Sequence, residues 1–529
     1  MNHILLLTGT VILICLLTGK FTEKLGVPSL LAFIALGMFF GVDGIVKIPF
    51  DDYGVSETIC SVCLVFIMFY GGFGTNIKEA RPVMARAVVL STLGVLLTAG
   101  LTGGFVFLVL KLPLLESLLI GSVIASTDAA SVFNILRSKN LNLKNNTASL
   151  LEMESGSNDP ISYMLTVILT AMLTGQQLSV PVMLFQQLFF GILWGIVVGK
   201  AAVYLLNHAQ VTVTQGKTML VFSVAMLAYA LAAVTGGNGY LSVYLCGILM
   251  GNAYIPQKRD LVQFFDVLTG VAQMMIFFLL GLLVTPSQLP EVFLPSLLIM
   301  VFMTLIGRPA AVAALLAGFR APMGQIGVVS WAGLRGVASI VFSIYAVLND
   351  APMKYNLFNL VFCIVLLSIS TQGALLPWVS RKMNMIDEHA DVRRTFNDYQ
   401  EESSIRFIKI SVGLAHPYVG KKLREILLPP ELLAVLILRQ KETIVPNGDT
   451  VIAPGDVLVA AGQEFEDRKN LTLQEITVGK HDKWTNRCLT EIPIPKGTLI
   501  VMVQRGDQTI IPRGDTVIRE GDVLVKASF

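Results

Sequence analysis

The sequence predicts a polytopic all-α membrane protein with a soluble α/β tail, and three observations carry this prediction. Hydrophobic residues make up 54% of the 529 residues and charged residues 14%, whereas soluble proteins carry about 25% charged residues. The charges are also unevenly placed, because residues 381–529 hold 42 of the charged side chains and the first 380 residues hold 33. Finally, helix-length apolar stretches fill the first part of the chain, so this part is expected to lie in a membrane.

Thirteen apolar stretches are long enough to be transmembrane helices. A helix satisfies its own backbone hydrogen bonds, as the bilayer core requires, and about 20 apolar residues cross that core. The expected spans lie near residues 4–19, 28–46, 56–73, 86–110, 114–136, 147–172, 181–206, 217–234, 239–254, 262–285, 292–317, 323–348 and 355–379. Lys20 and Lys24 follow the first stretch, and no small-residue cleavage site does, so it is expected to be a retained helix.

The loops between these stretches differ in charge. Lys and Arg side chains concentrate in the odd-numbered loops, whereas the even-numbered loops contain only Lys47, Lys111 and Lys354. Positive residues are retained on the cytoplasmic side of a membrane. The odd loops and the tail are therefore expected in the cytoplasm, and the N-terminus outside.

The tail contains an internal duplication. Residues 443–459 read TIVPNGDTVIAPGDVLV and residues 509–525 read TIIPRGDTVIREGDVLV, at an offset of 66 residues. Short β-branched runs alternate with turn residues, which predicts a strand, a helix near 418–427 and three more strands in the first copy. The expected domains are a transmembrane domain at 1–382, a linker at 383–404, and two small repeats at 405–466 and 467–529.

A polar segment interrupts the sixth apolar stretch and reads Glu154-Ser155-Gly156-Ser157-Asn158-Asp159-Pro160. Ionisable groups inside a membrane are costly and mark functional sites by default. Pro160 cannot donate a hydrogen bond to the carbonyl of Gly156, so this oxygen is available to an ion or a water. Several oxygens close together suit a hard cation, and Asp159 is the expected centre of the site. A polar patch that joins helices is the structural alternative.

Three further charged residues lie inside expected spans. Asp128 ends a Ser-Thr-Asp run in the fifth stretch, where side-chain bonds to the backbone favour a break in the helix. Broken helices hold the ion sites of many transporters. Arg308 lies deep in the eleventh stretch and needs an acidic partner, for which Glu154 is the candidate. Arg335 opens the glycine-rich twelfth stretch, or else its side chain reaches the cytoplasmic face.

Together these motifs resemble the monovalent cation:proton antiporter superfamily. The resemblance covers the membrane domain and is carried by Ser126-Thr127-Asp128, Glu154-Ser155, Asn158-Asp159-Pro160 and Gly333-Leu334-Arg335-Gly336. The Asn-Asp pair, in place of Asp-Asp, resembles the electroneutral branch. The tail resembles, in tandem, the C-terminal ligand-binding (RCK C-terminal) module of regulators of potassium conductance. The combination is similar to the bacterial potassium/proton antiporters of the NhaP kind, which implies a multi-pass protein of the bacterial cytoplasmic (inner) membrane.

The resemblance also implies a fold and a set of roles. The fold would be two inverted six-helix repeats after an extra first helix, with the fifth and twelfth spans as broken, crossing helices. The partners would be membrane lipid and a second copy of the chain in a homodimer. The implied roles are cation and proton binding for Asp159, site building for Asp128, Thr127, Asn158 and Ser155, a supporting ion pair of Glu154 and Arg308, and a second cationic position at Arg335.

The expected function is secondary transport and not enzymatic catalysis. Cytoplasmic potassium, with sodium as the alternative, would leave as external protons enter, in the service of pH homeostasis. One carboxylate holds a proton or a cation but not both, because the proton removes the charge that the cation needs. If Asp159 alone changes its load, one cation is exchanged for one proton without net charge movement. The tail would regulate this exchange by binding a small cytoplasmic ligand, for which a nucleotide is one candidate, and no resident cofactor is expected.

Other classes of protein fit the sequence less well. A ligand-gated cation channel would share the tail, but no selectivity-filter segment is visible between the spans. An intramembrane serine protease needs a histidine within the membrane, and all five histidines lie at the ends of the stretches or in the tail. A net charge of +3 without a basic stripe gives no case for nucleic-acid binding.

The remaining polar residues predict no additional site. The six cysteines form no disulfide framework or zinc constellation, so no metal is expected beyond the transported monovalent cation. No G-x-G-x-x-G motif follows a strand in the tail, so no Rossmann half is expected there. Glu152 and Asp266 lie nearer to helix ends and are interpreted as water-exposed structural residues.

Overall fold

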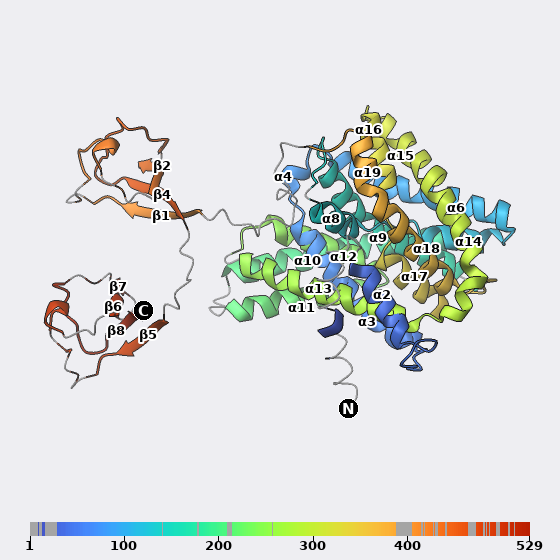
Figure 1. Ribbon diagram of the computed structural model, residues 1–529, viewed down its shortest axis with the longest axis horizontal. Coiled ribbons are helices and arrows are strands. Elements are labelled where there is room, and N and C mark those ends of the chain that lie inside the picture. The colour runs from blue at the N-terminus through green and yellow to red at the C-terminus, as the bar shows by residue number, and fades with distance from the viewer. Residues whose placement is uncertain are drawn as a thin grey trace. The chain divides into compact units, whose positions relative to one another are not determined.

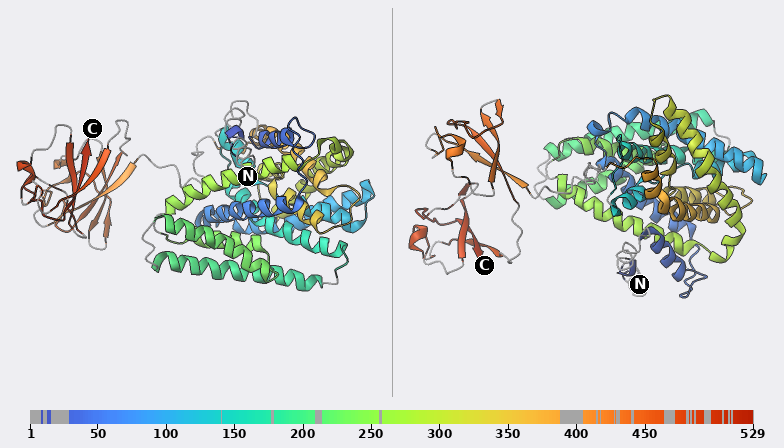
Figure 2. Two further views of the ribbon diagram at one scale, coloured as in Figure 1. Left: turned by 90° about the horizontal axis from the view of Figure 1, so that it is seen from below. Right: turned by 45° about the horizontal axis from the view of Figure 1, so that its top comes forward.

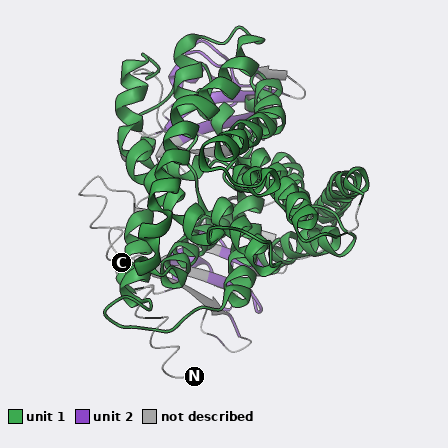
Figure 3. Cartoon of the chain, turned by 90° about the vertical axis from the view of Figure 1, so that its right-hand side faces the viewer, with its two compact units in different colours: residues 1–401 green, residues 402–529 purple. Residues whose placement is uncertain are grey.

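The computed structural model divides into two compact units, residues 1–401 and 402–529, which Figure 3 shows in different colours. The first unit is helical and the second is built mainly of strands. The structure describes residues 9, 13–15, 29–139, 141–176, 179–208, 214–255, 258–387, 405–413, 416, 418–426, 428, 432–439, 442–463, 472–479, 482, 484–485, 487–492, 498–505, 508–510, 512 and 514–528.

Apolar helices make up the first unit. Seven of the described helices are long and apolar enough to cross a membrane, and three shorter apolar helices accompany them. The helices are α2 (Ser29–Phe40), α3 (Tyr53–Gly74), α4 (Ile77–Ala80), α5 (Met84–Val89), α6 (Val95–Phe105), α7 (Leu114–Val123), α8 (Ala129–Ser138), α9 (Thr147–Leu173), α10 (Val180–His208), α11 (Thr214–Val234), α12 (Gly239–Asn252), α13 (Lys258–Leu283), α14 (Leu289–Phe302), α15 (Arg308–Ala317), α16 (Met323–Trp331), α17 (Val337–Leu348), α18 (Leu357–Ser368) and α19 (Ala374–Lys382).

The helices follow the expected stretches closely. Every stretch from 28–46 to 355–379 falls on one or more helices, whereas the stretch near 4–19 lies outside the described residues apart from 9 and 13–15. Side-chain caps of the usual Asp and Asn type stand at three of the helix starts. Asp52, Asn238 and Asn356 accept backbone hydrogen bonds at 2.9, 3.0 and 3.1 Å at the starts of α3, α12 and α18.

Two of the stretches are broken into half-helices. Residues 126–128 are non-helical between α7 and α8, and residues 333–336 are non-helical between α16 and α17. The first break coincides with the Ser-Thr-Asp run, as predicted, and the second with the Gly-Leu-Arg-Gly run. Short π-helical segments occur in other helices, where they alter the direction of the side chains that follow. They are η1 (Leu90–Gly94), η2 (Val106–Leu110), η4 (Met303–Gly307) and η5 (Ile369–Gly373).

The helices pack in two groups. The first group is α2, α3 and α10 to α13, the second is α5 to α9 and α14 to α19, and most contacts lie within a group. In Figure 1, α10, α11 and α13 lie at one end of the unit and α6, α14 and α15 at the other, and Figure 2 shows long helices running side by side. Contacts between the groups come chiefly from α3, α9, α12 and α17. Small residues permit close packing within the first group, since a β-carbon at Gly37 or Gly281 would lie 2.2 or 2.3 Å from a facing carbonyl oxygen.

The second unit contains two four-stranded antiparallel sheets of the same topology, with strand orders β1-β4-β2-β3 and β5-β8-β6-β7. Their registers repeat at the sequence offset, since Ser411 pairs with Val457 and Thr477 with Val523. The strands are β1 (Ile405–Ser411), β2 (Leu432–Arg439), β3 (Glu442–Ile444), β4 (Val457–Gln463), β5 (Thr472–Thr477), β6 (Thr498–Arg505), β7 (Gln508–Ile510) and β8 (Val523–Ser528).

The helix expected near 418–427 is wrong for the described residues of that range. One 3-10 turn, Leu423–Glu425, stands there, and Leu489–Glu491 is its counterpart in the second sheet. Gly420 has a φ of +79° just before the turn, and two prolines follow soon after it in the sequence. The positive φ before the turn and the prolines after it leave only a few residues that could continue as a helix. In its described part the tail is therefore a β-sheet unit and not the expected α/β unit.

Each sheet buries one aspartate against an arginine. Asp456 and Asp522 are 1% and 0% exposed. Arg439 donates two hydrogen bonds of 2.8 Å to Asp456, and Arg505 donates two of 2.8 Å to Asp522. These bonds hold the pKa of both carboxyls below its usual range. The duplication in the sequence thus extends to individual atomic contacts.

Candidate functional site

The two helix breaks meet in the interior of the helical unit. The backbone N–H of Asp128 donates a 2.8 Å hydrogen bond to the carbonyl oxygen of Leu334. The guanidinium of Arg335 donates a 2.8 Å bond from Nη1 to the carbonyl oxygen of Ser126. Half-helix ends satisfied in this way lie within the hydrophobic interior without leaving their backbone groups unpaired.

Two glycines of the second break make this approach possible. A β-carbon at Gly336 would lie 2.5 Å from Cβ of Asp128, and one at Gly333 would lie 2.7 Å from Nε of Arg308. A side chain at either position would therefore displace the Asp128 or the Arg308 side chain. The Gly-Leu-Arg-Gly run therefore supplies two positions without side chains, Gly333 and Gly336, at the place where the two breaks meet. It also supplies the carbonyl oxygen of Leu334 and the guanidinium of Arg335.

Asp159 projects from α9 toward the first break. Its Oδ1 accepts a 2.5 Å hydrogen bond from the hydroxyl of Ser126. Asp128 is engaged by its own helix, since the hydroxyl and the N–H of Ser131 donate to its carboxylate at 2.5 and 3.2 Å. This arrangement caps the start of α8. Of the two aspartates, Asp159 is bound by fewer groups of its own helix.

The other polar residues of α9 fasten this helix to the break. Asn158 donates from Nδ2 to Oγ1 of Thr127 at 2.5 Å. The hydroxyl of Ser155 donates to the carbonyl of Thr127 at 2.6 Å and accepts from the N–H of Ala129 at 2.9 Å. These side chains satisfy backbone groups that the break leaves open, so they position the non-helical segment beside Asp159.

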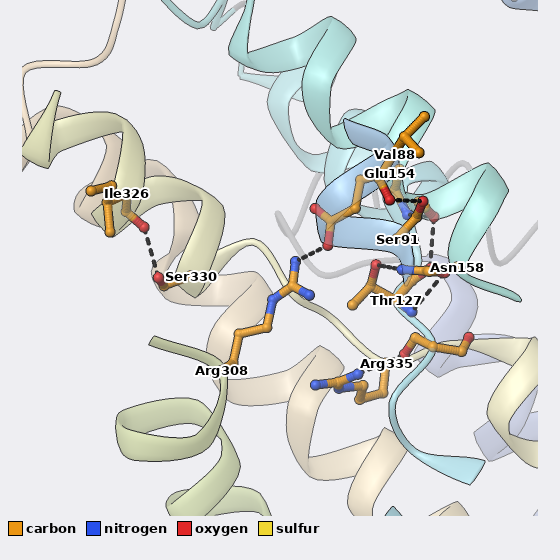
Figure 4. A network of polar contacts seen from close by, with 12 residues as sticks. Val88, Ser91, Thr127, Glu154, Asn158, Arg308, Ile326, Ser330 and Arg335 are labelled. Carbon is orange, nitrogen blue, oxygen red and sulfur yellow. Dashed lines mark hydrogen bonds and ion pairs between the residues drawn. The ribbon is translucent and has the colours of Figure 1, made fainter. Parts of the chain in front are cut away.

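Arg308 and Glu154 form a buried ion pair. Nη2 of Arg308 lies 2.6 Å from Oε1 of Glu154, and the two side chains are 4% and 1% exposed. Figure 4 shows the guanidinium of Arg308 pointing at the carboxylate of Glu154, with Thr127 to one side of the pair. The π-helical segment η4 ends directly before Arg308, so it sets the direction of this side chain. Among the described residues, Nε of Arg308 has no hydrogen-bond partner.

Arg335 lies inside the protein and does not reach its surface. Its side chain is 0% exposed, which disagrees with the alternative that it extends to the cytoplasmic face. Within the described part of the chain, Nε and Nη2 of Arg335 have no hydrogen-bond partner. Among the described residues, the site therefore contains the buried guanidinium groups of Arg308 and Arg335 near the ion-paired carboxylate of Glu154 (Figure 4).

A cavity of about 360 Å³ reaches the two aspartates. Asp128, Asp159, Thr127 and Ser155 line it, and so do Glu152 and Asp266. The sequence interpretation missed the last two, because it treated them as structural residues near helix ends. A signal existed for Glu152, since positions 152, 155, 156 and 159 share one face of a helix. No comparable signal marked Asp266, which comes from α13 and accepts a 3.1 Å hydrogen bond from the hydroxyl of Tyr70.

The chemistry of the cavity suits a small hard cation or a proton. Most of its polar side chains carry carboxylate or hydroxyl oxygens, which can replace the hydration shell of an alkali ion. No group of three or more His, Cys, Asp and Glu side chains that could hold a metal ion occurs among the described residues.

Comparison with known proteins agrees with this chemistry. The family model described as "Sodium/hydrogen exchanger, transmembrane" matches residues 9–382, and the TrkA-C domain matches residues 408–464 and 473–525. The chain belongs to the sodium/hydrogen exchanger family. The family assignment predicted from the motifs, with two RCK C-terminal modules in tandem, is confirmed. Members of this exchanger family are transporters and not enzymes, as expected.

This exchanger is similar in sequence to proteins named as potassium/proton antiporters. The chain is 36% identical to the K(+)/H(+) antiporter NhaP of Alkalimonas amylolytica over 387 residues, covering 73% of this chain and 67% of that protein. It is 32% identical to the K(+)/H(+) antiporter NhaP2 of Shewanella oneidensis over 472 residues, covering 88% and 82%. The predicted resemblance to antiporters of the NhaP kind is thereby confirmed.

Solved structures show the same fold for the exchanger domain. The sodium proton antiporter MjNhaP1 from Methanocaldococcus jannaschii superposes with a TM-score of 0.64 at 22% sequence identity, covering 72% of this chain and 99% of that one. At this identity the comparison bears on the fold alone. It supports a helical membrane domain of the exchanger type, to which the small sheets of the tail are added.

Proposed function

We propose that this protein is a secondary active antiporter that exchanges a cytoplasmic monovalent cation for external protons. Potassium is the favoured cation, because the relatives matched over most of their length are named potassium/proton antiporters. The observation that carries the proposal is Asp159, a carboxylate that lines a cavity beside two broken helices. Sodium is the alternative cation. A channel is less favoured, since the chain belongs to an exchanger family.

In the proposed mechanism Asp159 is loaded in turn by a cation and by a proton. The ionised carboxylate attracts the cation, and protonation removes that charge, so each ion displaces the other. The hydroxyl of Ser126, at 2.5 Å, orients Asp159, while Thr127, Asn158 and Ser155 hold the backbone of the break in place. Asp128 completes the oxygen lining of the cavity. Because Asn158 cannot titrate, the proposed exchange is electroneutral.

The buried arginine side chains, Arg308 and Arg335, have supporting roles in this proposal. The pair of Glu154 and Arg308 fixes α9 against α15 while the load on Asp159 changes. Arg335 holds the first break through the carbonyl of Ser126, at 2.8 Å, and adds positive charge that balances the aspartates. A buried network of this kind gives a defined geometry rather than a large gain in stability.

The proposed architecture has thirteen spans in two inverted repeats. A long helix, a broken helix and another long helix occur in this order at 84–110, 114–138 and 147–173, and again at 289–317, 323–348 and 357–382. The broken helices are the fifth and twelfth spans, and this odd offset of seven spans inverts the second set relative to the first. The broken helices hold equivalent positions if the seventh span, α10, connects two six-helix repeats. We prefer this alignment to the expected one, in which the repeats begin after the first helix, because the two broken helices would then hold different positions in their repeats.

The proposed setting is the cytoplasmic membrane of a bacterium. The N-terminus lies outside and the tail inside, because Lys and Arg residues concentrate in the odd-numbered loops. The chain would assemble as a homodimer, and the exposed apolar face of α10, with Phe185 and Phe189 62% and 46% exposed, suits lipid or a second copy. The two sheets of the tail would bind a small cytoplasmic ligand, such as a nucleotide, that changes the rate of exchange.

Reconstitution into liposomes that contain a pH-sensitive dye tests this function. Addition of potassium should drive proton movement that an uncoupler collapses, sodium should drive less, and a clamped membrane potential should leave the rate unchanged. A larger response to sodium would select the sodium alternative. Single-channel currents in a planar bilayer, or no proton movement with either cation, would overturn the antiporter proposal.

A further inference from the structure

The residues that line the cavity at Asp159 lie on one side of this carboxylate. On α9 its lining residues run from Glu152 to Asp159, on α3 from Leu64 to Gly71, and on α17 they include Val337 and Ala338. These positions lie on the same side of Asp159, toward the N-terminal end of α9. The cavity thus gives access to the carboxylate from one face of the unit.

An aromatic cluster begins one helical turn beyond Asp159. The ring of Tyr163 lies 4.9 Å from that of Tyr240, 5.3 Å from that of Phe342 and 5.6 Å from that of Tyr345, measured between centroids. Tyr229 extends the cluster, at 5.2 Å from Tyr240. The rings pack in edge-to-face and tilted arrangements, which are specific in their geometry, and Tyr240 and Phe342 at their centre are 1% and 0% exposed.

The change from cavity to aromatic cluster occurs at the same level on each helix. On α9 it falls between Asp159 and Tyr163, and on α12 between Tyr244, which lines the cavity, and Tyr240. On α17 it falls between Ala338, which lines the cavity, and Phe342. Separations of four residues, about one helical turn, place these changes at a single depth.

Both helix groups contribute to the cluster. Tyr163 and Phe342 come from α9 and α17 of the second group, whereas Tyr240 comes from α12 of the first. The hydroxyl of Tyr240 donates a 3.1 Å hydrogen bond to Oγ of Ser61, whose own hydroxyl donates to Oε1 of Glu57 at 2.9 Å. A chain of polar contacts from α3 therefore holds the Tyr240 ring against the rings of the other group.

We propose that Tyr163 and Tyr240 form the seal that separates Asp159 from the external solution, and that the Ser61–Glu57 pair holds this seal closed. This inference rests on the proposed antiport function. If both sides of the membrane reached Asp159 at once, protons would cross without a cation and the coupling would be lost. The seal lies between the two helix groups, so a displacement of one group against the other opens it and closes the cavity side. Tyr163 and Tyr240 are thus coupling residues that need not bind the ion.

Proton leak in the absence of alkali cations tests the seal. Liposomes loaded with dye are given a pH gradient in choline thiocyanate, whose permeant anion balances the charge that protons carry. The wild type should show little proton movement until potassium is added. Tyr163→Ala should show cation-independent proton movement at a rate comparable to wild-type exchange, whereas Tyr163→Phe, which keeps the ring, should remain tight. Tyr204→Ala is the matched control, since Tyr204 is 63% exposed on α10.

Further variants keep the test decisive. Tyr240→Ala removes the ring from the other helix group and should leak as Tyr163→Ala does. Tyr240→Phe removes the bond to Ser61 and should leak less than either truncation, but measurably more than the wild type. If the two alanine variants are monodisperse and remain tight, the seal is refuted. If neither alanine variant is recovered folded, a tight Tyr240→Phe refutes the proposal. Wild-type vesicles that lack any potassium- or sodium-dependent proton movement would refute the antiporter function separately.

Discussion

The helical unit and the tail both bury a carboxylate against an arginine, but they satisfy these groups to different degrees. In the tail, Asp522 accepts two bonds from Arg505 and one from the N–H of Arg519, all at 2.8 Å. In the helical unit, Glu154 and Arg308 share one contact of 2.6 Å, and within the described residues Nε of Arg308 has no hydrogen-bond partner.

This difference indicates different purposes. A fully bonded carboxylate at the end of a strand fixes one conformation and gains little from any change nearby. In a low-dielectric interior, the electrostatic energy of an incompletely bonded ion pair changes strongly when a neighbouring charge appears or disappears. Glu154 of this pair lies on α9, the helix that carries Asp159, where such a change accompanies every proposed cycle. The tail pairs are therefore expected to govern stability, and the membrane charges to govern transport as well.

The largest expected effect separates transport from folding at Asp159. The Asp159→Asn variant keeps a carbonyl oxygen that can accept from Ser126, but it has neither the charge for a cation nor a titratable proton. Exchange in liposomes should fall to the level of protein-free vesicles, while the thermal unfolding of the detergent-solubilised protein should change little. Asp350→Asn, in the exposed loop after α17, should leave exchange unchanged. Coupled exchange above background in Asp159→Asn would contradict the proposed role.

The next effect concerns the pair of Glu154 and Arg308. Removal of one partner leaves the other charge buried without compensation, at a cost of about 3–5 kcal/mol in the free energy of unfolding. Glu154→Gln and Arg308→Gln should each lower the unfolding temperature. The double variant should lose less than the sum of the two, because it leaves no unpaired charge.

A second double-mutant cycle, with an arginine that does not contact Glu154, distinguishes coupling between Glu154 and Arg308 from independent losses of stability. Glu154→Gln combined with Arg381→Gln, which alters an exposed residue at the end of α19, should give an additive loss. Additive losses for Glu154 and Arg308 as well would show that the two side chains stabilise the fold independently.

The smallest expected effect is local to the tail. Arg505→Gln leaves the buried Asp522 with fewer donors, which should lower the stability of the second sheet by about 1–3 kcal/mol. Arg424→Gln is the control, because the Arg424–Asp449 pair has side chains 60% and 66% exposed, and such pairs contribute about 0–1 kcal/mol. Urea unfolding followed by the fluorescence of Trp484, the sole tryptophan of the tail, measures both, with Trp484→Phe as the baseline.

The same measurement has a predicted pH dependence. Hydrogen bonds from Arg505 are the main cause that lowers the pKa of Asp522 in the folded tail. The stability that this gives is therefore present above the unfolded value, about 3.9, and is lost as the pH falls through the folded value. The difference between the wild type and Arg505→Gln should be full at pH 7 and should shrink below about pH 3.9. A difference that stayed constant between pH 7 and pH 3 would exclude Asp522 as its source.

The contact between Glu154 and Arg308 could be anticipated because a buried charge requires a partner, and few candidates exist in apolar helices. The break at 126–128 could be anticipated because Ser, Thr and Asp compete with helical hydrogen bonds. By contrast, the bond between Asp128 and Leu334 joins residues about two hundred positions apart, and no local pattern encodes it. For the same reason Asp266 is interpreted from the sequence as a structural residue, and Tyr240 is not singled out. Their surroundings are set by helix packing, which a single sequence does not specify.

The two glycines of the second break have a consequence for inherited variation. Every missense change of a glycine codon adds a β-carbon, which at Gly333 would lie 2.7 Å from Nε of Arg308 and at Gly336 would lie 2.5 Å from Cβ of Asp128. A single base change at either codon therefore displaces a charged side chain of the crossing while every charged residue remains encoded. Leu334, between them, takes part through its carbonyl oxygen, and its side chain is 0% exposed in the core, so this position requires a well-packed apolar side chain but no polar group. Loss-of-function alleles of the ion site are thus expected at two codons that specify no functional group.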